Sequence, residues 1–295
     1  MNNQLKAYIN LSLAMIIVGS SVVVGKLITD SLPIFLSSFL SLLIASILFL
    51  PSIVPLIKSN QLTRSDYFYL GLQGLLGTVL YRIFFFLGLK YIDASFAGII
   101  SALQPAMISV LAILFLREKL SPKEKFGIGL AVSGLMMAYL ANKVTVTLGS
   151  GLLIGTILVL LAVLGGACIS VFAKKLNKQV SPMAIAGMVT LISCGLSLPT
   201  ALYDLLTFNI TSITPFGFGL IAYYGVFLTY ISFILWFKGL KQVSASVAGV
   251  FTALVPVSGI LLSIIFLKET PNLFEFVGGL LIILSIILVV YKNEK

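Results

Sequence analysis

The chain has 295 residues, of which 59% are hydrophobic and only 9% are charged, and its formal net charge is +10. So few charges cannot cover the surface of a soluble domain of this length, so the composition excludes a soluble globular protein and predicts a membrane protein. The positive charges lie in short connectors between apolar stretches, which argues against a nucleic-acid partner.

Ten apolar stretches follow one another along the chain, each close to the roughly 20 residues with which a helix crosses a bilayer core of about 30 Å. Little chain is left for a soluble domain. We therefore expect an all-α polytopic membrane protein with ten transmembrane helices. The stretches are 7–28, 33–57, 67–89, 95–116, 123–141, 150–173, 182–203, 215–237, 244–267 and 272–291.

The second half of the chain repeats part of the first. The segment from Gly88 to Glu118 recurs 151 residues later, from Gly239 to Glu269, and 15 of its 31 positions are identical without a gap. The offset is about half the chain, so the sequence predicts two five-helix units, 1–146 and 147–295. Because five is odd, the second unit crosses the membrane in the opposite sense, which makes a 5+5 inverted-topology repeat.

Charge predicts the orientation of these helices. With ten crossings, both termini share one membrane face with the loops after helices 2, 4, 6 and 8, and that face collects 14 lysines and arginines against 4 on the other. Such residues in short loops favour the cytoplasmic side, so both termini are expected in the cytoplasm. Inverted repeats are typical of secondary transporters with alternating access. The alternative is an ancient duplication that only serves packing.

Helices 4 and 9 each present small residues at four-residue spacing, followed by a proline. Rows of small residues let another helix backbone approach closely. The prolines predict a kink in mid-span, which is either a gating hinge or a structural bend. The small residues are Ala94, Gly98 and Ala102 in helix 4 and Ala245, Gly249 and Ala253 in helix 9, and the prolines are Pro105 and Pro256.

Glu118 and Glu269 end these two helices, beside Arg117 and Lys268. The inversion predicts that they lie at opposite membrane faces. We interpret them as interfacial carboxylates that pair with a neighbouring cation and frame a gate, and not as proton carriers.

Arg82 is the single charged residue deep within a predicted span. It precedes Lys90 by eight residues, so it lies about 12 Å from the outer end of its helix at about 1.5 Å per residue. A charge at this depth is unfavourable unless it faces a wet cavity or a partner. Either Arg82 snorkels to the outer headgroups, or it lines a central cavity and binds a carboxylate or phosphate. Phe233 takes the matching position in the second unit, so such a site would be asymmetric.

Other polar side chains within the spans complete the candidate substrate site. Gln104 stands beside a proline, although a hydrogen bond between helices would also explain it. Tyrosines often anchor helices at the membrane interface, so each has a second explanation. The remaining candidates are Tyr81, Tyr223, Tyr224, Tyr230, Ser20 and Gln73.

The sequence offers no ligand set for a metal and no catalytic set. It has no histidine, and its two cysteines, Cys168 and Cys194, lie in different predicted helices. We therefore expect no metal, no cofactor and no enzymatic activity.

Several motifs point to a known family. They are Gly88-Leu-Lys-Tyr, Ala94-Ser-x-Ala-Gly, Leu103-x-Pro105 and Phe115-Leu-Arg-Glu118, each with a copy in 239–269, and Val18-Gly19-Ser20-Ser21 near the start. Over essentially the whole chain they resemble EamA-type transporters of the drug/metabolite transporter superfamily, although the aromatic residue that often precedes the first glycine is missing. The resemblance implies a ten-helix carrier of the bacterial inner membrane that moves amino acids, other small metabolites or toxic compounds, commonly outward.

The function that we expect is therefore a secondary transporter that exports a small metabolite, such as an amino acid, whose carboxylate binds Arg82. The chain has no phosphate-binding P-loop, and the interior of its predicted spans has no acidic residue or histidine for a proton relay, which favours facilitation or exchange. The alternatives are an importer of a vitamin or nucleotide precursor and a non-transporting membrane scaffold. The expected partners are a small molecule and the lipid bilayer, and a homodimer is left open.

Overall fold

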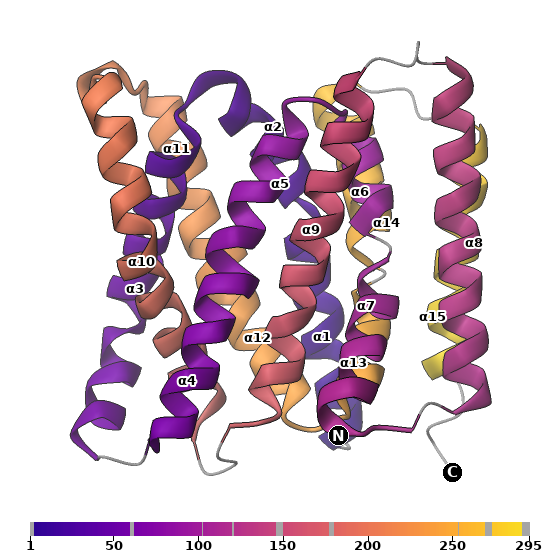
Figure 1. The fold of residues 1–295 in the computed structure, drawn as a ribbon, viewed down its shortest axis with the longest axis horizontal. Helices are drawn as coiled ribbons and strands as arrows, with labels where there is room; N and C mark the ends of the chain where they lie inside the picture. Colours follow the sequence, from indigo (N-terminus) through magenta and orange to yellow (C-terminus); the bar gives the residue numbers. More distant parts are fainter. Residues whose placement is uncertain are drawn as a thin grey trace.

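The computed structural model describes residues 3–59, 62–101, 103–119, 121–145, 150–176, 180–252, 254–268 and 273–290. In these ranges the chain forms helices joined by turns and no β-strand, which confirms the expected all-α class for this part of the chain (Figure 1). The first half contains α1 (Asn3–Gly19), α2 (Ser21–Ser31), α3 (Ile34–Lys58), α4 (Arg64–Leu72), η1 (Gln73–Leu80), α5 (Tyr81–Leu89), α6 (Ala94–Ser101), α7 (Gln104–Leu111), η2 (Ala112–Leu116) and α8 (Pro122–Thr145). The second half contains α9 (Ser150–Ala173), α10 (Pro182–Thr207), η3 (Ile210–Ser212), α11 (Pro215–Tyr223), η4 (Tyr224–Ile231), α12 (Ser232–Leu240), α13 (Ala245–Phe251), α14 (Leu254–Leu262), η5 (Ser263–Leu267) and α15 (Leu273–Val290).

Within the described residues, seven helical segments are long and apolar enough to cross a bilayer, so the protein is a multi-pass membrane protein. A shorter apolar helix runs over Gln104–Leu116, and α8 and α15 lie where the sequence predicts the fifth and tenth spans. The full number of ten crossings stays a prediction. The seven segments are Gln4–Ser31, Ile34–Lys58, Arg64–Leu89, Gly151–Ala173, Pro182–Thr207, Pro215–Leu240 and Ala245–Leu267.

One span is longer than the sequence predicts. α10 continues to Thr207, beyond the expected end at 203, and therefore includes Asp204. The Asp204 carboxylate accepts hydrogen bonds of 2.9 Å from the backbone N–H groups of Phe35 and Leu36, at the start of α3. A helix N-terminus favours negative charge. This span therefore has an acidic residue near its end, which the predicted end at 203 left outside the span.

Two spans have a π-helix in the middle. The π-helix η1 lies between α4 and α5, and the π-helix η4 lies between α11 and α12. The bounds of these two sets of three helices match at an offset of 151 residues; for example, η1 begins at Gln73 and η4 begins at Tyr224. π-helices are rare and are frequent at functional sites. The recurrence indicates that the repeated unit has kept this irregularity in both copies.

The second pair of π-helices, η2 and η5, also recurs at this offset. Each ends at a residue in the left-handed conformation, Arg117 with φ 56° and Lys268 with φ 55°. A positive φ is uncommon for residues other than glycine. Its presence at both positions means that the two copies end this span in the same way.

The sequence led us to expect that Pro105 and Pro256 kink continuous helices, and this expectation is wrong. α6 ends at Ser101 and α7 begins at Gln104, so Pro105 lies in the first turn of α7, and Pro256 lies likewise in the first turn of α14. A first turn tolerates proline because the N–H group that it lacks has no helical partner there. Each of these spans is therefore two helices in series.

The two halves pack against each other crosswise. α6 packs on α14 and α7 on α13, α1 packs on α12 and α14, and α9 packs on α5 and α7. A β-carbon on Gly98 would lie 3.9 Å from Pro256 Cα, and one on Gly249 would lie 3.1 Å from the Ile108 side chain. Both glycines therefore lie in the contact between the halves. Ala94 and Ala245 are also buried, whereas Ala102 and Ala253 lie outside the described residues.

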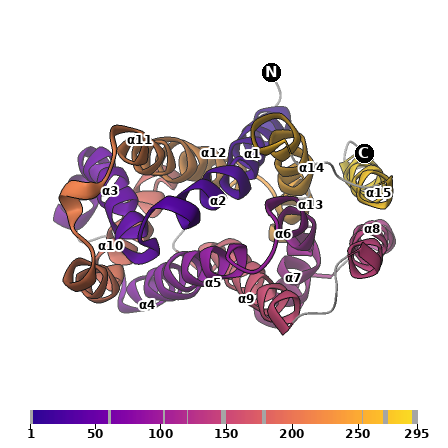
Figure 2. The same cartoon turned by 90° about the horizontal axis from the view of Figure 1, so that it is seen from above.

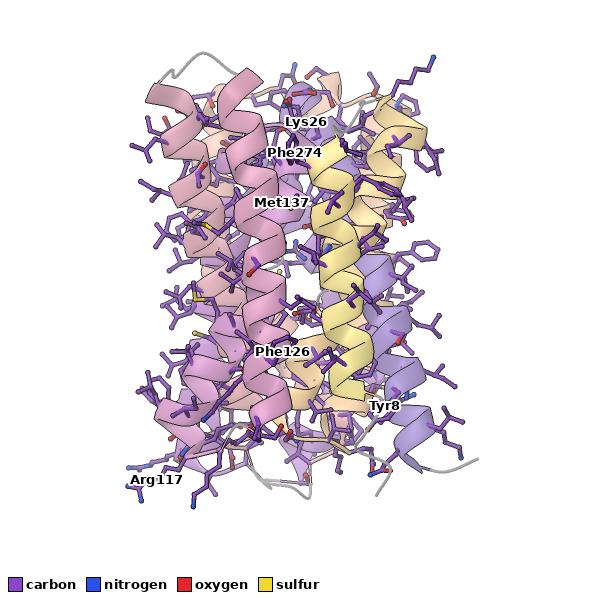
Figure 3. All side chains as sticks on the ribbon, turned by 90° about the vertical axis from the view of Figure 1, so that its right-hand side faces the viewer. Tyr8, Lys26, Arg117, Phe126, Met137 and Phe274 are labelled. Carbon is purple, nitrogen blue, oxygen red and sulfur yellow. The ribbon has the colours of Figure 1, made fainter. Side chains whose placement is uncertain are left out.

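The corresponding helices of the two halves run in opposite directions. In Figure 1, α4 and α5 lead upward whereas α11 and α12 lead downward, and α6 to α7 descends whereas α13 to α14 ascends. Seen from above, α8 and α15 lie side by side at one edge of the bundle (Figure 2). Figure 3 shows this edge face on, with Lys26 near one end of the bundle and Arg117 near the other.

Candidate functional site

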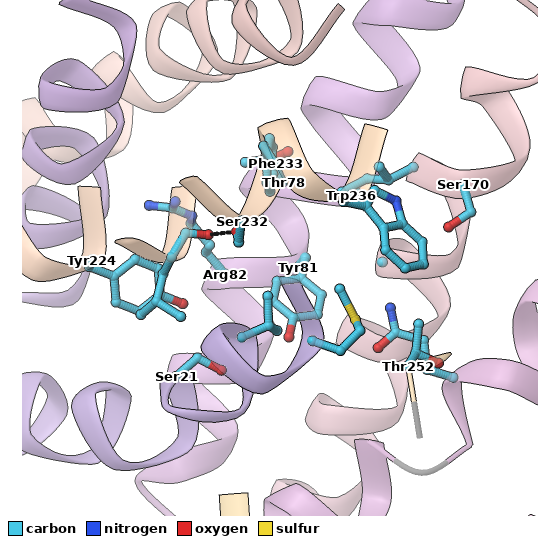
Figure 4. A pocket seen from close by; sticks show the side chains of 17 residues that line it. Ser21, Thr78, Tyr81, Arg82, Ser170, Tyr224, Ser232, Phe233, Trp236 and Thr252 are labelled. Carbon is cyan, nitrogen blue, oxygen red and sulfur yellow. Dashed lines mark hydrogen bonds between the residues drawn. The ribbon is translucent and has the colours of Figure 1, made fainter. Parts of the chain in front are cut away.

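A cavity of about 100 Å³ lies between the two halves. Helices α1, α2, η1, α5 and α7 of the first half and α9, η4 and α12 of the second half contribute to its wall, so both long π-helices reach it (Figure 4). The lining residues are Met15, Val18, Ser21, Gly77, Thr78, Tyr81, Arg82, Gln104, Gly166, Ile169, Ser170, Tyr224, Leu228, Ser232, Phe233, Trp236 and Thr252.

Arg82 lines this cavity and is only 4% exposed, so in this structure it does not snorkel to the headgroups. Its Nη1 donates to the Ser38 carbonyl at 3.2 Å and to Ser41 Oγ at 2.7 Å, and its Nη2 donates to Thr229 Oγ1 at 2.6 Å. Its Cζ lies 4.8 Å from the centroid of the Tyr224 ring, within the range of a cation–π interaction. The guanidinium is thus held between α3 and η4.

All of these partners are neutral. The three hydrogen bonds occupy three of the five donors of a guanidinium. No carboxylate within the described ranges forms an ion pair with Arg82, and no lining residue is Asp or Glu. The cavity therefore has a positive charge that the surrounding described side chains do not neutralise.

The π-helix explains how Thr229 reaches Arg82. Thr229 Oγ1 donates to the Tyr224 carbonyl five residues earlier at 3.0 Å, the spacing of a π-helical turn. The same hydroxyl accepts from Arg82. In the first half, Thr78 stands at the matching position and its Oγ1 donates to the Gln73 carbonyl, also five residues earlier, at 3.5 Å. The repeat therefore presents one threonine from each π-helix toward the site.

The two ends of the cavity differ in chemistry. In the view of Figure 4, Arg82 and Tyr224 lie at one end and Trp236 and Ser170 at the other, with Tyr81 between them. The Tyr81 ring stacks on the Phe85 ring, with the ring centroids 5.6 Å apart and an angle of 8° between the ring planes, and this stacking fixes the orientation of Tyr81. An elongated ligand would thus meet a cation at one end and an indole ring at the other.

Ser21 is a polar group of this cavity that lacks a partner. It is 3% exposed, and its Oγ forms no hydrogen bond with any residue that the structure describes. Buried polar groups are nearly always hydrogen-bonded, and an exception in a cavity points to water or a ligand.

Gln104 also lines the cavity, beside the glycine of a neighbouring helix. A β-carbon on Gly166 would lie 3.0 Å from Gln104 Nε2 and 3.2 Å from the Tyr81 ring. The absence of a side chain at Gly166 therefore leaves room for both groups at the cavity wall.

Four of the residues expected at the site do not line this cavity. Tyr223 OH lies 3.1 Å from Ser20 Oγ, the Tyr230 ring lies 4.6 Å from that of Phe49, and the fully buried Gln73 donates from Nε2 to the Tyr69 carbonyl at 3.2 Å. Gln73 and Tyr230 belong to the π-helices that reach the cavity, whereas Tyr223 lies at the end of α11 and Ser20 lies between α1 and α2. The contacts of all four are contacts between or within helices.

Glu118 binds a helix terminus instead of a neighbouring cation. Its carboxylate accepts hydrogen bonds from the N–H groups of Ala245 and Ser246 at 3.2 and 3.3 Å and from Ser246 Oγ at 2.5 Å. It therefore caps α13 of the other half, where negative charge is favourable. Glu269, its counterpart, lies outside the described residues.

Two lysines hold the two ends of the bundle in matching ways. Lys26 Nζ donates to the Leu89 carbonyl at the end of α5 at 2.9 Å, and Lys174 Nζ donates to the Leu240 carbonyl at the end of α12 at 2.5 Å. Lys174 also donates to the Val243 carbonyl. Positive charge at a helix C-terminus is favourable.

Sequence reasoning missed part of this site. Thr229 and Ser41 bind Arg82, and Trp236, Thr78 and Ser21 line the cavity. The one available signal was the internal repeat, because Thr78 and Thr229 are equivalent at the offset of 151. Within the described residues, no group of three His, Cys, Asp or Glu side chains could hold a metal ion.

The chain is similar to a known family of transporters along most of its length. The profile of the EamA-like transporter family matches residues 5–140 and 153–291. The chain is 36% identical over 293 residues to the uncharacterized transporter YetK of Bacillus subtilis, covering 99% of this chain and 89% of that protein. It is 24% identical to the uncharacterized transporter YyaM of the same organism, over 78% of this chain and 75% of that protein. An uncharacterized transporter of Archaeoglobus fulgidus is 28% identical over 75% of this chain and 76% of its own length.

A solved crystal structure shares the fold. It covers 97% of this chain and 98% of its own chain with a TM-score of 0.73, at 19% sequence identity.

Proposed function

The chain belongs to the EamA-like transporter family, and on this premise we propose that it is a secondary transporter that exports a small metabolite by alternating access. The observation on which the proposal rests is the cavity between the two halves, with the buried, unneutralised guanidinium of Arg82 in its wall. An intramembrane charge that faces a cavity is the usual mark of a substrate pathway.

The architecture that we propose is two inverted five-helix units, 1–146 and 147–295. The offset of 151 residues between matching helix bounds and the opposite directions of matching helices support it (Figure 1). The crosswise packing supports it too, since each half is completed by the other. Such pairs of half-bundles around a shared site can exchange conformations and open the site to alternate sides.

The gating elements that we propose are the contacts between the halves. Gly249 allows α13 to approach Ile108 of the opposite half closely, and Gly98 lies in the contact between α6 and Pro256. The breaks before Pro105 and Pro256 divide each of these spans into two parts that can move separately. Glu118 joins the halves at one end through α13. Breaking that contact would open the cavity toward that end.

The orientation is proposed from charge. The face that holds both termini has 14 of the lysines and arginines against 4 on the other face, which favours a cytoplasmic position for both termini in a bacterial inner membrane. Lys174 and Glu118 then lie at the cytoplasmic end, and Lys26 lies at the outer end.

The substrate that we propose is a small metabolite with a carboxylate, the broad class that includes the amino acids expected from the sequence. A planar guanidinium with free donors fits a carboxylate, and Gln104, Tyr81 and Tyr224 lie within the same wall.

A binding screen followed by a flux assay tests this function. The purified protein is heated with a panel of amino acids and carboxylic acids, because a ligand that binds only the folded state raises the unfolding temperature. Compounds that raise it are then tested for flux in proteoliposomes. We expect a flux that saturates and that exceeds the flux of protein-free vesicles. A folded protein that moves none of its ligands would contradict the proposal and favour a scaffold.

A further inference from the structure

The charge of the cavity restricts the charge of its substrate. Arg82 is the only one of the 17 lining residues that is charged at neutral pH, and it is held by neutral acceptors alone. An unpaired charge in the membrane interior is unfavourable. A ligand with one negative charge neutralises this site, whereas a zwitterion leaves it positive and a dianion leaves it negative.

The same wall has no carboxylate to pair with an ammonium group. A carboxylate is the strongest partner for a second buried cation, and none of the lining residues is Asp or Glu. The guanidinium also repels a second cation at short range. An α-amino acid would bring its ammonium group within a few ångströms of the carboxylate that binds Arg82, so the site disfavours it.

The remaining polar groups suit a neutral hydrogen-bonding substituent. Ser21 has a buried hydroxyl without a partner among the described residues, and hydroxyl groups both donate and accept. At the end of the cavity opposite Arg82, the Trp236 ring offers a wide apolar surface (Figure 4). A hydroxy or keto acid with an apolar body has the groups that this wall can satisfy.

Resting on the transport function proposed above, we propose that the substrate is an organic monocarboxylate without a charged amino group, and that the membrane potential drives its export. At an inside-negative potential of about 100 mV, the equilibrium concentration of a monoanion is about 50-fold higher outside the membrane than inside. Outward movement of such an anion needs no coupling ion. This agrees with a cavity wall that has no carboxylate or histidine to carry a proton.

The test uses the full-length protein in proteoliposomes with 3-phenyllactate and phenylalanine. These compounds match in size and differ by a hydroxyl in place of the ammonium group. Phenylsuccinate adds a dianion. Efflux is measured at pH 7.5, with a potassium diffusion potential set by valinomycin, and the efflux of protein-free vesicles is subtracted.

We expect efflux of phenyllactate to exceed that of phenylalanine and of phenylsuccinate by at least about tenfold, the ratio produced by a loss of about 1.4 kcal/mol. An inside-negative potential should accelerate phenyllactate efflux, and an inside-positive one should slow it. Two results overturn the inference: faster efflux of phenylalanine than of phenyllactate, or phenyllactate efflux that does not depend on the membrane potential. Either result leaves the transport function standing. If none of the compounds moves, both the inference and the transport function fail.

Three variants connect the selectivity to the guanidinium. Arg82→Gln removes the charge and should abolish the preference for the monoanion, whereas Arg82→Lys keeps the charge and should keep the preference at lower affinity. Arg64→Gln, on the exposed start of α4, is the matched control and should behave as the unmodified protein. Retention of the preference in Arg82→Gln contradicts the assignment. The dependence of the unmodified protein on the potential tests the proposal even if Arg82→Gln does not fold.

Discussion

Arg82 and Thr229 join the two halves of the protein through a hydrogen bond of 2.6 Å from Nη2 to Oγ1, although 147 residues separate them in the sequence. The bond depends on the π-helix η4, whose wider turn lets Thr229 donate to the Tyr224 carbonyl while it accepts from Arg82. The charged group of the cavity is therefore supported by the half that lacks a charge at the equivalent position, Phe233.

Replacing this threonine should weaken both the fold and the site. Thr229→Val keeps the shape and removes the acceptor, so a buried donor of Arg82 loses its partner, at a cost of about 1–3 kcal/mol. Thermal unfolding and ligand affinity measure the two effects. Thr78→Val is the control for stability from the other half, because Thr78 donates only a long bond of 3.5 Å to the Gln73 carbonyl and is not among the described hydrogen-bond partners of Arg82. Equal losses of stability in both variants would contradict the special role of Thr229.

Ser21→Ala should separate binding from stability. The Ser21 hydroxyl has no partner within the described part of the chain, so its removal should leave the unfolding temperature unchanged or slightly higher. Binding of a hydroxy acid should weaken about fivefold, which corresponds to one neutral hydrogen bond of about 1 kcal/mol. The adjacent Ser20→Ala, which loses a contact to Tyr223, should lower stability and spare affinity. The opposite pattern would place the ligand elsewhere.

Gly166→Ala should narrow the cavity. The new methyl group would lie 3.0 Å from Gln104 Nε2 and 3.2 Å from the Tyr81 ring, so those side chains would have to move into the cavity. We expect at least about a tenfold loss of affinity, the ratio that corresponds to about 1.4 kcal/mol. Gly195→Ala in α10 is the control, because its β-carbon would meet nothing within 4 Å, and it should be neutral or stabilising by up to about 1 kcal/mol. An unaffected affinity in Gly166→Ala would contradict the cavity as the binding site.

Glu118→Gln should loosen one end of the contact between the halves. The neutral amide has one acceptor oxygen, so it keeps the hydrogen bond from Ala245 or those from Ser246 but not both, and it loses the attraction of a negative charge for the start of α13. We expect a loss of about 1 kcal/mol in unfolding free energy, measured by thermal denaturation at low salt. Lys119→Gln changes an exposed charge on the neighbouring loop and serves as the control. A loss that is equal in both variants would mean that the cap does not stabilise the contact.

The sequence predicts the class of fold well because its main signals are long and repeated. Apolar stretches of about 20 residues indicate helices directly, and the copy of 88–118 at 239–269 indicates the duplication. Arg82 was a candidate because a lone charge in an apolar span requires a special environment. Its depth alone could not decide between snorkelling and the cavity, since that depends on which face of α5 packs inward.

Other features of the site depend on tertiary structure. Hydropathy does not distinguish a π-helix from an α-helix, so the sequence could not predict that Thr229 points inward. For the same reason it could not predict that Tyr224 lines the cavity whereas its neighbour Tyr223 does not. The prolines indicated an interruption but not its form, because a proline suits both a kink and a first turn. Glu118 has a cation beside it in sequence, but its partner is the start of a helix 127 residues away.

The most direct test of the central claim, that the cavity between the halves binds the substrate, is the fluorescence of Trp236. This residue is the only tryptophan of the chain, and it lies in the cavity wall. A compound that the reconstituted protein transports should change the Trp236 emission with a saturable dependence on concentration, and Arg82→Gln should shift that dependence to higher concentration by about tenfold or more. A transported compound that saturates the flux and leaves the emission unchanged would contradict the account.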